Sequence, residues 1–295
     1  MPVKQTTIFQ PMRYKAFYFA LSLLVIIPGL YSLLRYGLNL GIDFTGGTTI
    51  VWQAPSLSED QVRETLSKRQ IELQEIKQDG DTWSLTTSAI TRSTYQELLA
   101  DFTPPPQEIE FNSLGPSVGR ELVGKTLAGI GLAAGLILLY VAYRFKSFKY
   151  GLSAILAMLH DSLVLLGVFS LLGHFMGVKV DTLFVTALLT ILSFSVHDTI
   201  VVYDRIRELS KKHAYLSYEE IVNRAVVETL GRSINNSMTI IFMLLSMYLL
   251  GGETTRWFIF ALLVGTISGT YSSTFTAAPL LLVWDKLARR SRLHS

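Results

Sequence analysis

The stretch Leu183–Tyr203, LFVTALLTILSFSVHDTIVVY, decides the fold of this chain. It is apolar for long enough to cross about 30 Å of hydrocarbon, which takes about 20 residues of helix. It also holds two adjacent ionisable residues, His197 and Asp198, in its inner half. Ionisable side chains inside a span are costly, and they normally face the interior of a helix bundle or water. The stretch therefore predicts a membrane helix that belongs to a bundle and whose ionisable side chains face the bundle interior or water.

Five further apolar runs have a comparable length. They are Phe17–Leu34, Leu122–Tyr143, Gly151–Leu172, Ile234–Leu250 and Trp257–Trp284. With 49% hydrophobic and 17% charged residues, the chain has too little charge for a water-soluble surface of this size. No small-residue cleavage site follows the first run, which Arg35 and Tyr36 close, so we expect it to be a retained helix rather than a signal peptide. The sequence predicts an α-helical polytopic membrane protein with six transmembrane helices.

Lysine and arginine gather on one side of these spans, and cytoplasmic loops carry such an excess. That side receives Lys4, Arg13, Lys15, Arg144, Lys146, Lys149, the loop 204–233, Lys286, Arg289, Arg290 and Arg292. We therefore expect both termini in the cytoplasm and the segment 36–119 outside it, which in a bacterium means the periplasmic or outward-facing side of the inner membrane. The formal net charge of +3 is too small to indicate a nucleic-acid partner.

The segment 36–119 has the pattern of a folded soluble domain and holds 12 acidic against 5 basic residues. A strand at 48–53, a helix from a capping box at Ser58 and Gln61, a hairpin around 79–81, a helix at 93–101 and a strand at 108–111 follow one another. The order β-α-β-β-α-β predicts a small α+β ferredoxin-like domain. The chain thus divides into 1–35 (cytoplasmic N-terminus and first helix), 36–119 (insert), 120–284 (helices two to six) and 285–295 (basic tail).

No metal site is expected in the insert. Its acidic residues Glu59, Asp60, Asp79 and Asp81 lie near turns and helix caps, where solvated surface is the simpler interpretation. The chain has no cysteine, which excludes disulfides, thiolate metal sites and thiol nucleophiles.

Two glycine-rich motifs flank the insert. Gly41, Asp43, Gly46 and Gly47 belong to the motif GIDFTGG directly after the first span, and Gly115, Pro116 and Gly119 belong to GPSVG before the second. Glycine allows the positive φ angles and close backbone approach that tight turns at a membrane edge need. A phosphate-binding loop is the alternative for the first motif, but a strand rather than a helix follows it, and no lysine comes after the glycines.

Small residues predict close helix packing in two spans. Gly131 and Gly135 form a small-xxx-small pair in the second span, and Gly265 and Gly269 form another in the sixth. The sixth span is also rich in serine and threonine. Those hydroxyls either bond back to helix carbonyls or line a hydrated path.

Buried ionisable residues mark the third and fourth spans. His160 and Asp161 lie near the middle of the third span, and Asp161 has a weaker claim to function than Asp198. Adjacent residues project about 100° apart on a helix, so we expect neither His-Asp pair to form a dyad by itself.

Asp198 has the stronger claim because of its neighbours on the fourth span. It shares a helical face with Ser195 and Arg205, and Asp204 and Arg205 mark the cytoplasmic exit. The two readings of Asp198 are a proton or ion role and a structural ion pair, and we favour the first. No H-E-x-x-H, G-x-S-x-G or Walker motif is present, so we do not expect an enzyme.

The motifs LGIDFTGG at 40–47, GPSVG at 115–119, HDTIVVYDRIRE at 197–208 and TLGR at 229–232, in this order and spacing, carry a family resemblance. The chain resembles the SecD/SecF family, and within it the smaller, SecF-type subunits, whose membrane fold is of the resistance-nodulation-division type. The resemblance implies a subunit that couples the proton motive force to late steps of protein export. It also implies a proton path through Asp198 and Arg232, with His197, Ser195, Arg205, Asp204, His160 and Asp161 as supporting polar groups.

The resemblance further implies the partners. These are SecD, the SecYEG channel, the translocating polypeptide and further accessory membrane subunits, with protons as the coupling ion and no cofactor. Two other functions stay open at this point. The chain could be half of a proton-driven exporter of lipids or small molecules, or a purely structural subunit that holds SecD at the channel.

Overall fold

The structure is a computed structural model that describes residues 10–293. Lys4, which the charge count includes, and the last two residues of the basic tail lie outside this range. Within it, six helical segments have the length and hydropathy of membrane spans, which confirms the predicted number. They are Pro11–Tyr36, Pro116–Phe145, Phe148–Met176, Thr182–Lys212, Tyr218–Leu250 and Thr254–Leu287.

The chain forms two compact units. One comprises 40–128, and the other comprises the residues up to Asn39 together with those from Gly129 onward. The first unit therefore contains the insert and the beginning of the second span, and the second unit contains the rest of the helices. Each is described by itself below.

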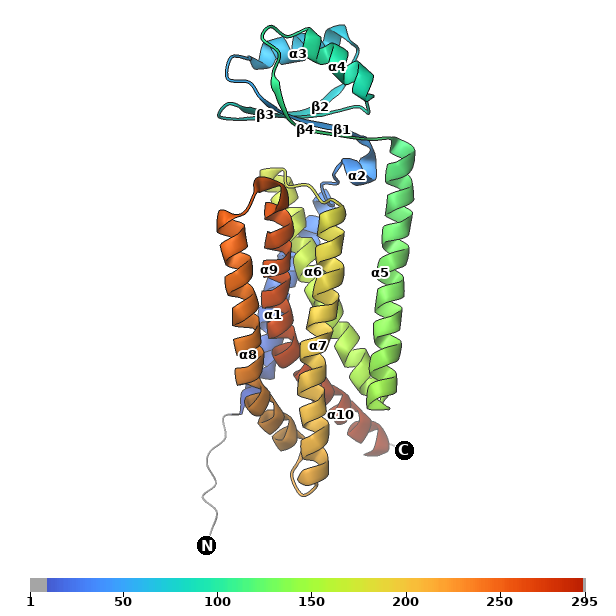
Figure 1. Cartoon of the computed structure of the whole chain (residues 1–295). Coiled ribbons are helices and arrows are strands. Elements are labelled where there is room, and N and C mark those ends of the chain that lie inside the picture. The colour runs from blue at the N-terminus through green and yellow to red at the C-terminus, as the bar shows by residue number, and fades with distance from the viewer. Residues whose placement is uncertain (1–9, 294–295) are drawn as a thin grey trace. The chain divides into compact units, whose positions relative to one another are not determined.

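The insert unit is a four-stranded antiparallel sheet covered on one face by two helices, α3 (Glu59–Lys68) and α4 (Arg92–Ala100) (Figure 1). The strands are β1 (Gly47–Gln53), β2 (Leu73–Asp79), β3 (Thr82–Thr87) and β4 (Gln107–Leu114), in the order β2-β3-β1-β4. This is the predicted βαββαβ arrangement. The predicted capping box at Ser58 and Gln61 is present at the start of α3.

The core of the insert lies between the sheet and its helices. Trp52, Trp83 and Tyr95 are its largest side chains, and none is more than 1% exposed. Their polar atoms are satisfied, because Trp52 Nε1 donates to the Tyr95 hydroxyl at 2.9 Å and Trp83 Nε1 donates to the Ala54 carbonyl at 3.2 Å. A core of this size, without a disulfide, explains how so short an insert folds.

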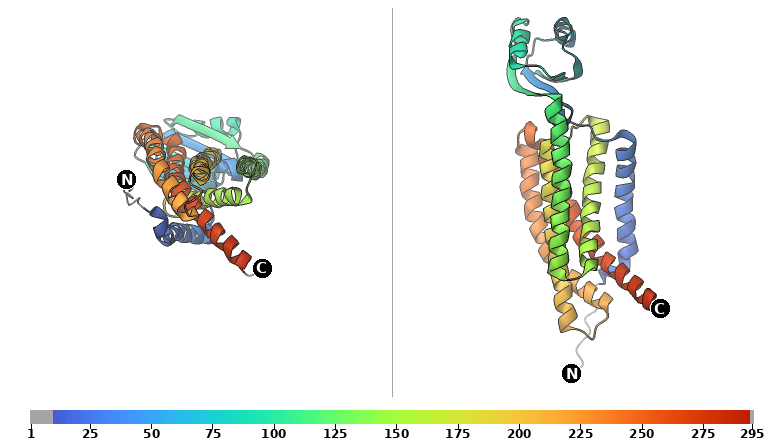
Figure 2. Two further views of the ribbon diagram at one scale, coloured as in Figure 1. Left: turned by 90° about the horizontal axis from the view of Figure 1, so that it is seen from below. Right: turned by 90° about the vertical axis from the view of Figure 1, so that its right-hand side faces the viewer.

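The membrane unit is a helix bundle. Its helices are α1 (Lys15–Tyr36), α6 (Phe148–Met176), α7 (Thr182–Lys212), α8 (Tyr218–Leu250), α9 (Glu253–Ser272) and α10 (Ala278–Leu293), with the final part of α5 (Pro116–Phe145). A π-helical segment, Ser273–Ala277, joins α9 to α10. The beginning of α1 and the whole of α10 lie at the same end of the bundle (Figures 1 and 2), as an even number of spans requires.

The segment 204–233, expected as a loop, is mostly helical. Helix α7 continues to Lys212 and α8 begins at Tyr218, so only a short connection separates them. The reason is local: Ser217 and Glu220 form a second capping box, which the sequence analysis did not identify. The two spans therefore extend well beyond their apolar parts.

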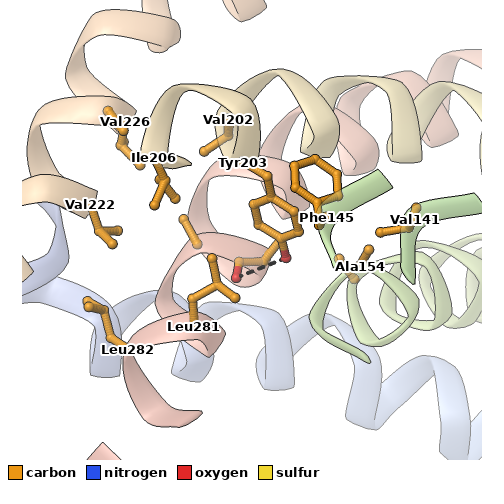
Figure 3. Packing of buried hydrophobic residues seen from close by; sticks show 14 of the residues in the cluster. Val141, Phe145, Ala154, Val202, Tyr203, Ile206, Val222, Val226, Leu281 and Leu282 are labelled. Carbon is orange, nitrogen blue, oxygen red and sulfur yellow. Dashed lines mark hydrogen bonds between the residues drawn. The ribbon is translucent and has the colours of Figure 1, made fainter. Parts of the chain in front are cut away.

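Buried apolar side chains fill the end of the bundle where α7 and α8 meet (Figure 3). Tyr203 is central there, fully buried, with its ring edge-on to Phe145 and its hydroxyl 3.5 Å from the Ala277 carbonyl of the π-helical segment. Val222 and Leu281 belong to the same cluster. Packing at this end thus joins α5, α7, α8 and α10.

Glycines set the closest helix contacts, but not all the predicted ones. A Cβ on Gly265 would lie 2.1 Å from the Ile191 side chain, so the sixth-span pair packs against α7 as expected. At Gly131 and Gly135 an added Cβ meets nothing within 4 Å in the described chain, so the close contact predicted at this glycine pair is absent here. The tightest α1–α6 contact, Gly29 on Gly167, was not anticipated.

Candidate functional site

Asp161 is the most connected buried ionisable residue of the bundle. Its carboxylate is fully buried and accepts hydrogen bonds from Ser195 of α7 (2.6 Å) and from Ser268 (2.5 Å) and Ser272 (2.6 Å) of α9. His160 Nδ1 lies 3.0 Å from the same carboxylate. Charge-assisted bonds of this kind are stronger than neutral ones, so Asp161 ties α6 to α7 and α9.

The expectation that adjacent His and Asp residues diverge was wrong for the first pair. The His160 and Asp161 side chains are hydrogen-bonded, because the imidazole turns back toward the carboxylate while its other nitrogen reaches Ser22 at 3.0 Å. For the second pair the expectation agrees with the structure: His197 is exposed and Asp198 is buried. The angle of about 100° between adjacent residues describes the directions in which their side chains leave the helix. A long side chain such as that of His160 can still bend back toward its neighbour.

Asp198 is 4% exposed, and its carboxylate accepts a hydrogen bond of 2.7 Å from Ser233 of α8. Ser195, one turn earlier on α7, turns to Asp161 instead. The two buried carboxylates therefore accept hydrogen bonds from different helices, Asp161 from α7 and α9, and Asp198 from α8. Ser233 is the partner that sequence reasoning missed, although it directly follows Arg232 in the chain.

Arg232 is exposed and lines a polar cleft of about 520 Å³ between α7 and α8. The same cleft is lined by Asp204, Arg205 and Glu228. The described structure thus brings Arg232 close to the charged ends of α7 and α8, while the hydroxyl that contacts Asp198 comes from Ser233.

Asp204 and Arg205 are engaged in ion pairs. Asp204 accepts a hydrogen bond of 3.0 Å from Arg144, and Arg205 pairs with Glu208 and Glu228. These side chains are all 31–47% exposed, so each pair adds little stability by itself. The pairing of Arg205 with Glu228 joins α7 to α8 beside the cleft.

The two glycine motifs, expected as separate turns, form one interlocked joint. The first motif makes a single helical turn, α2 (Ile42–Thr45), and an added Cβ on Gly46 would lie 2.6 Å from the Pro116 Cα. Conversely, a Cβ on Gly119 would lie 2.7 Å from the Phe44 carbonyl oxygen. Gly46 and Gly47 also have positive φ angles of 74° and 134°. Only glycine satisfies both the conformation and the backbone contact.

The remaining motif residues belong to the same joint. The Gly41 carbonyl accepts hydrogen bonds from the Phe44 amide (3.0 Å) and the Thr45 hydroxyl (3.2 Å), and Asp43 is half-buried in this turn. The Gly115 carbonyl accepts from the Val118 amide at 3.1 Å and opens α5. The joint therefore fixes where the chain enters and leaves the insert.

The arrangement suits charge movement within a membrane. It places two carboxylates inside a six-helix protein, with three serine hydroxyls on Asp161 and one on Asp198, and leaves a polar cleft at one end. Among residues 10–293, no three His, Asp or Glu side chains are grouped so that they could hold a metal ion. These features define a class: multi-pass membrane proteins with buried carboxylates in the bundle and one ferredoxin-like insert after the first span.

Comparison with known proteins gives the family. The family model for the C-terminal part of the protein export membrane proteins SecD/SecF matches residues 94–287, and that for the SecD/SecF GG motif matches residues 31–51. The chain belongs to the SecD/SecF family. It is 43% identical to the protein translocase subunit SecF of Thermobaculum terrenum, over 92% of this chain and 93% of that protein.

The similarity extends to the SecDF proteins, in which a longer chain contains the matching region. The protein translocase subunit SecDF of Thermus thermophilus is 34% identical over 84% of this chain and 35% of its own. A crystal structure of the translocon-associated membrane protein SecDF from Thermus matches with a TM-score of 0.84 and 32% identity. The match covers 97% of this chain but 40% of the SecDF chain.

Proposed function

We propose that this chain is a SecF subunit of the Sec export machinery, which works with SecD to couple the proton motive force to late translocation through SecYEG. The observation that carries the proposal is the buried carboxylate of Asp198, held by a single hydroxyl between α7 and α8. The proposed activity is mechanical rather than enzymatic. The coupling ion is the proton, and no cofactor is required.

Protonation of Asp198 changes a contact between helices. As a carboxylate, Asp198 accepts the Ser233 hydrogen bond, and the bond joins α7 to α8. A neutral carboxyl is a weaker acceptor, so proton uptake loosens this junction. One charge that crosses 100 mV releases about 2.3 kcal/mol. That free energy shifts a conformational equilibrium about fifty-fold, which is enough for a useful rearrangement.

In this proposal Arg232 sets the charge around the proton path from the polar cleft. The cleft gives water access toward the α7–α8 junction, and its guanidinium groups repel an incoming cation until Arg232 moves. Ser233 follows Arg232 on α8, so a rotation of α8 that breaks the Asp198 contact also moves the guanidinium. Arg205, paired with Glu228, stabilises the resting position.

SecD is the proposed partner within the membrane. In the most apolar stretch of α5 no residue is buried, and a Cβ added at Gly131 or Gly135 would meet nothing within 4 Å in the described chain. A small-residue stripe of this kind normally packs against another helix. The SecDF relatives, of which this chain spans about two fifths, have the matching region and a further part in one polypeptide.

The proposed location is the cytoplasmic membrane of a bacterium, with both termini in the cytoplasm and the insert outside. The outer insert would then lie near the emerging polypeptide, and the basic α7–α8 end would lie inside. Further accessory membrane subunits could join the SecD–SecF pair at the channel.

The test is protein translocation into vesicles that contain SecYEG and SecD, with or without this chain, and with the proton gradient intact or collapsed by an uncoupler. We expect the chain to raise completed translocation only when the gradient is intact. Equal stimulation after uncoupling would show a purely structural subunit.

A further inference from the structure

His160 lies at the meeting point of three helices and has a polar contact at each ring nitrogen. Nδ1 contacts the Asp161 carboxylate at 3.0 Å, and Nε2 contacts the Ser22 hydroxyl of α1 at 3.0 Å. The side chain is 8% exposed. The Ser22 hydroxyl is itself 3.3 Å from the Tyr271 hydroxyl of α9, which donates to the Tyr18 carbonyl at 2.7 Å.

Counting donors shows that this network has room for one more proton. The Tyr271 proton is used by the Tyr18 carbonyl, so the Ser22–Tyr271 contact needs the Ser22 proton. When Ser22 donates to Tyr271, His160 Nε2 must donate to Ser22, and a proton must also lie between Nδ1 and Asp161. When Nε2 has no proton, the Ser22 hydroxyl turns to it instead. Rotation of one hydroxyl therefore accommodates the gain or loss of one proton.

The extra proton also neutralises the pair. With a neutral imidazole, His160 and Asp161 together carry one negative charge in the middle of the bundle, balanced only by hydroxyl dipoles. With one proton more, shared between the ring and the carboxylate, their net charge is zero. Buried net charge is costly in a low-dielectric interior, and a proton shared by two such groups belongs to the pair rather than to either residue.

A groove on the side of the bundle borders His160. It has a volume of about 350 Å³, its walls are apolar, with Val25, Val164 and Val264 among them, and His160 and Tyr271 lie along it. These two are the titratable side chains among its lining residues. The groups that contact His160 are Asp161 from its own helix and Ser22 from α1, and the Tyr271 ring lies 6.0 Å away on α9.

We propose that the His160–Asp161 pair is a second proton-binding site of the bundle, separate from Asp198, in which the Ser22 hydroxyl turns to accommodate the proton. With both ring nitrogens protonated, His160 donates to Asp161 and to Ser22 at once, and the second bond ties α6 to α1. The use of this proton in export rests on the proposed function. The binding itself does not, and it can be measured without export.

The experiment is a pH titration of the ring ¹⁵N signals of His160 in the full chain, in lipid nanodiscs, with signals assigned from His160→Gln. We expect His160 to pass from one bare ring nitrogen to two protonated nitrogens as the pH falls. Asp161→Asn should lower its proton affinity about tenfold or more, because the opposite charge is lost. Ser22→Ala, which leaves Asp161 and its serines in place, should lower it in the same direction.

Asp198→Asn is the matched comparison. This variant should leave the His160 titration unchanged. The proposed function predicts that the same variant loses gradient-dependent export, so the two proposals can fail independently. A ring that keeps one bare nitrogen throughout the pH range in which the chain is folded would overturn the second site. So would a titration that neither Asp161→Asn nor Ser22→Ala displaces.

Discussion

Gly119→Ala tests the interlocked joint between the two glycine motifs. The new Cβ would lie 2.7 Å from the Phe44 carbonyl oxygen, 2.9 Å from its carbon and 3.0 Å from the Gly46 amide nitrogen. All three are backbone atoms, which cannot turn aside as a side chain can. Overpacking of this kind costs about 1–3 kcal/mol. The joint, with the adjoining Gly47–Leu114 pair of β1 and β4, should open more readily.

Gly124→Ala is the matched control on the same helix. A Cβ there meets nothing within 4 Å, so this variant has only the gain in helix propensity, up to about 1 kcal/mol, that both substitutions share. The difference between the variants therefore isolates the clash. We expect the amides where β1 and β4 begin and end to exchange hydrogen about 5- to 150-fold faster in Gly119→Ala than in Gly124→Ala.

The assay is hydrogen–deuterium exchange of the full chain, followed by mass spectrometry of peptides from 40–60 and 105–120. Peptides from α8 provide an internal reference, because they belong to the other unit. Indistinguishable exchange in the two variants would mean that the joint yields at no cost, and the packing argument would be refuted.

Three further predictions follow from the fold. Gly167→Ala should weaken the α1–α6 contact and lower the melting temperature of the isolated chain, because its Cβ would lie 2.6 Å from the Gly29 Cα. Gly131→Ala, whose Cβ meets nothing within 4 Å, should change the melting temperature little, and equal melting temperatures of the two variants would contradict this. The Arg69 guanidinium lowers the pKa of Asp101, so the ion pair stabilises the insert above about pH 4 and is lost as the pH falls through the lowered value. Arg69→Met should therefore flatten the acid dependence of exchange in α4, and Arg63→Met, which leaves Asp101 paired, should not. Finally, since the chain has no cysteine, a membrane-impermeant thiol reagent should label Asp79→Cys but not Lys211→Cys in intact cells, and the reverse result would invert the topology.

The sequence was sufficient for most of the fold because the fold depends on local patterns. Apolar length gave the six spans, and the capping box and alternating strands gave the insert, since each of these signals lies within about 20 residues. The boundary between α7 and α8 was harder. The helices there continue into water as polar, ion-paired segments, and their hydropathy no longer distinguishes a helix from a loop.

The site was only partly predictable because its contacts join distant parts of the chain. Asp161 and Asp198 were identifiable as carboxylates inside spans, but the number of hydrogen-bond partners of each was not. Asp161 gains four hydrogen-bond partners from α6, α7 and α9, two of them serines more than 100 positions away. Spacing along one helix suggested that Ser195 faces Asp198, whereas the side chain turns to Asp161. Only the packing of the helices decides between such partners.

The glycine motifs illustrate the same limit. Each was recognisable as a turn that needs glycine, but their mutual contact, across about 70 residues of insert, follows only from the folded sheet. The small-residue pairs show the opposite case. The pattern at Gly265 coincides with a contact within the chain, and the same pattern at Gly131 coincides with none. Small residues allow close packing, but they do not specify which helix packs there.

The central claim, that Asp198 carries the coupling proton, is tested most directly by gradient-dependent translocation in vesicles that contain Asp198→Asn. The asparagine keeps the shape and still accepts from Ser233, but it cannot bind and release a proton. Glu121→Gln, which neutralises an exposed carboxylate on α5, serves as the control. At equal levels of assembled complex, the account predicts that Asp198→Asn abolishes the stimulation by the gradient and Glu121→Gln retains it. Undiminished stimulation in Asp198→Asn would contradict the account.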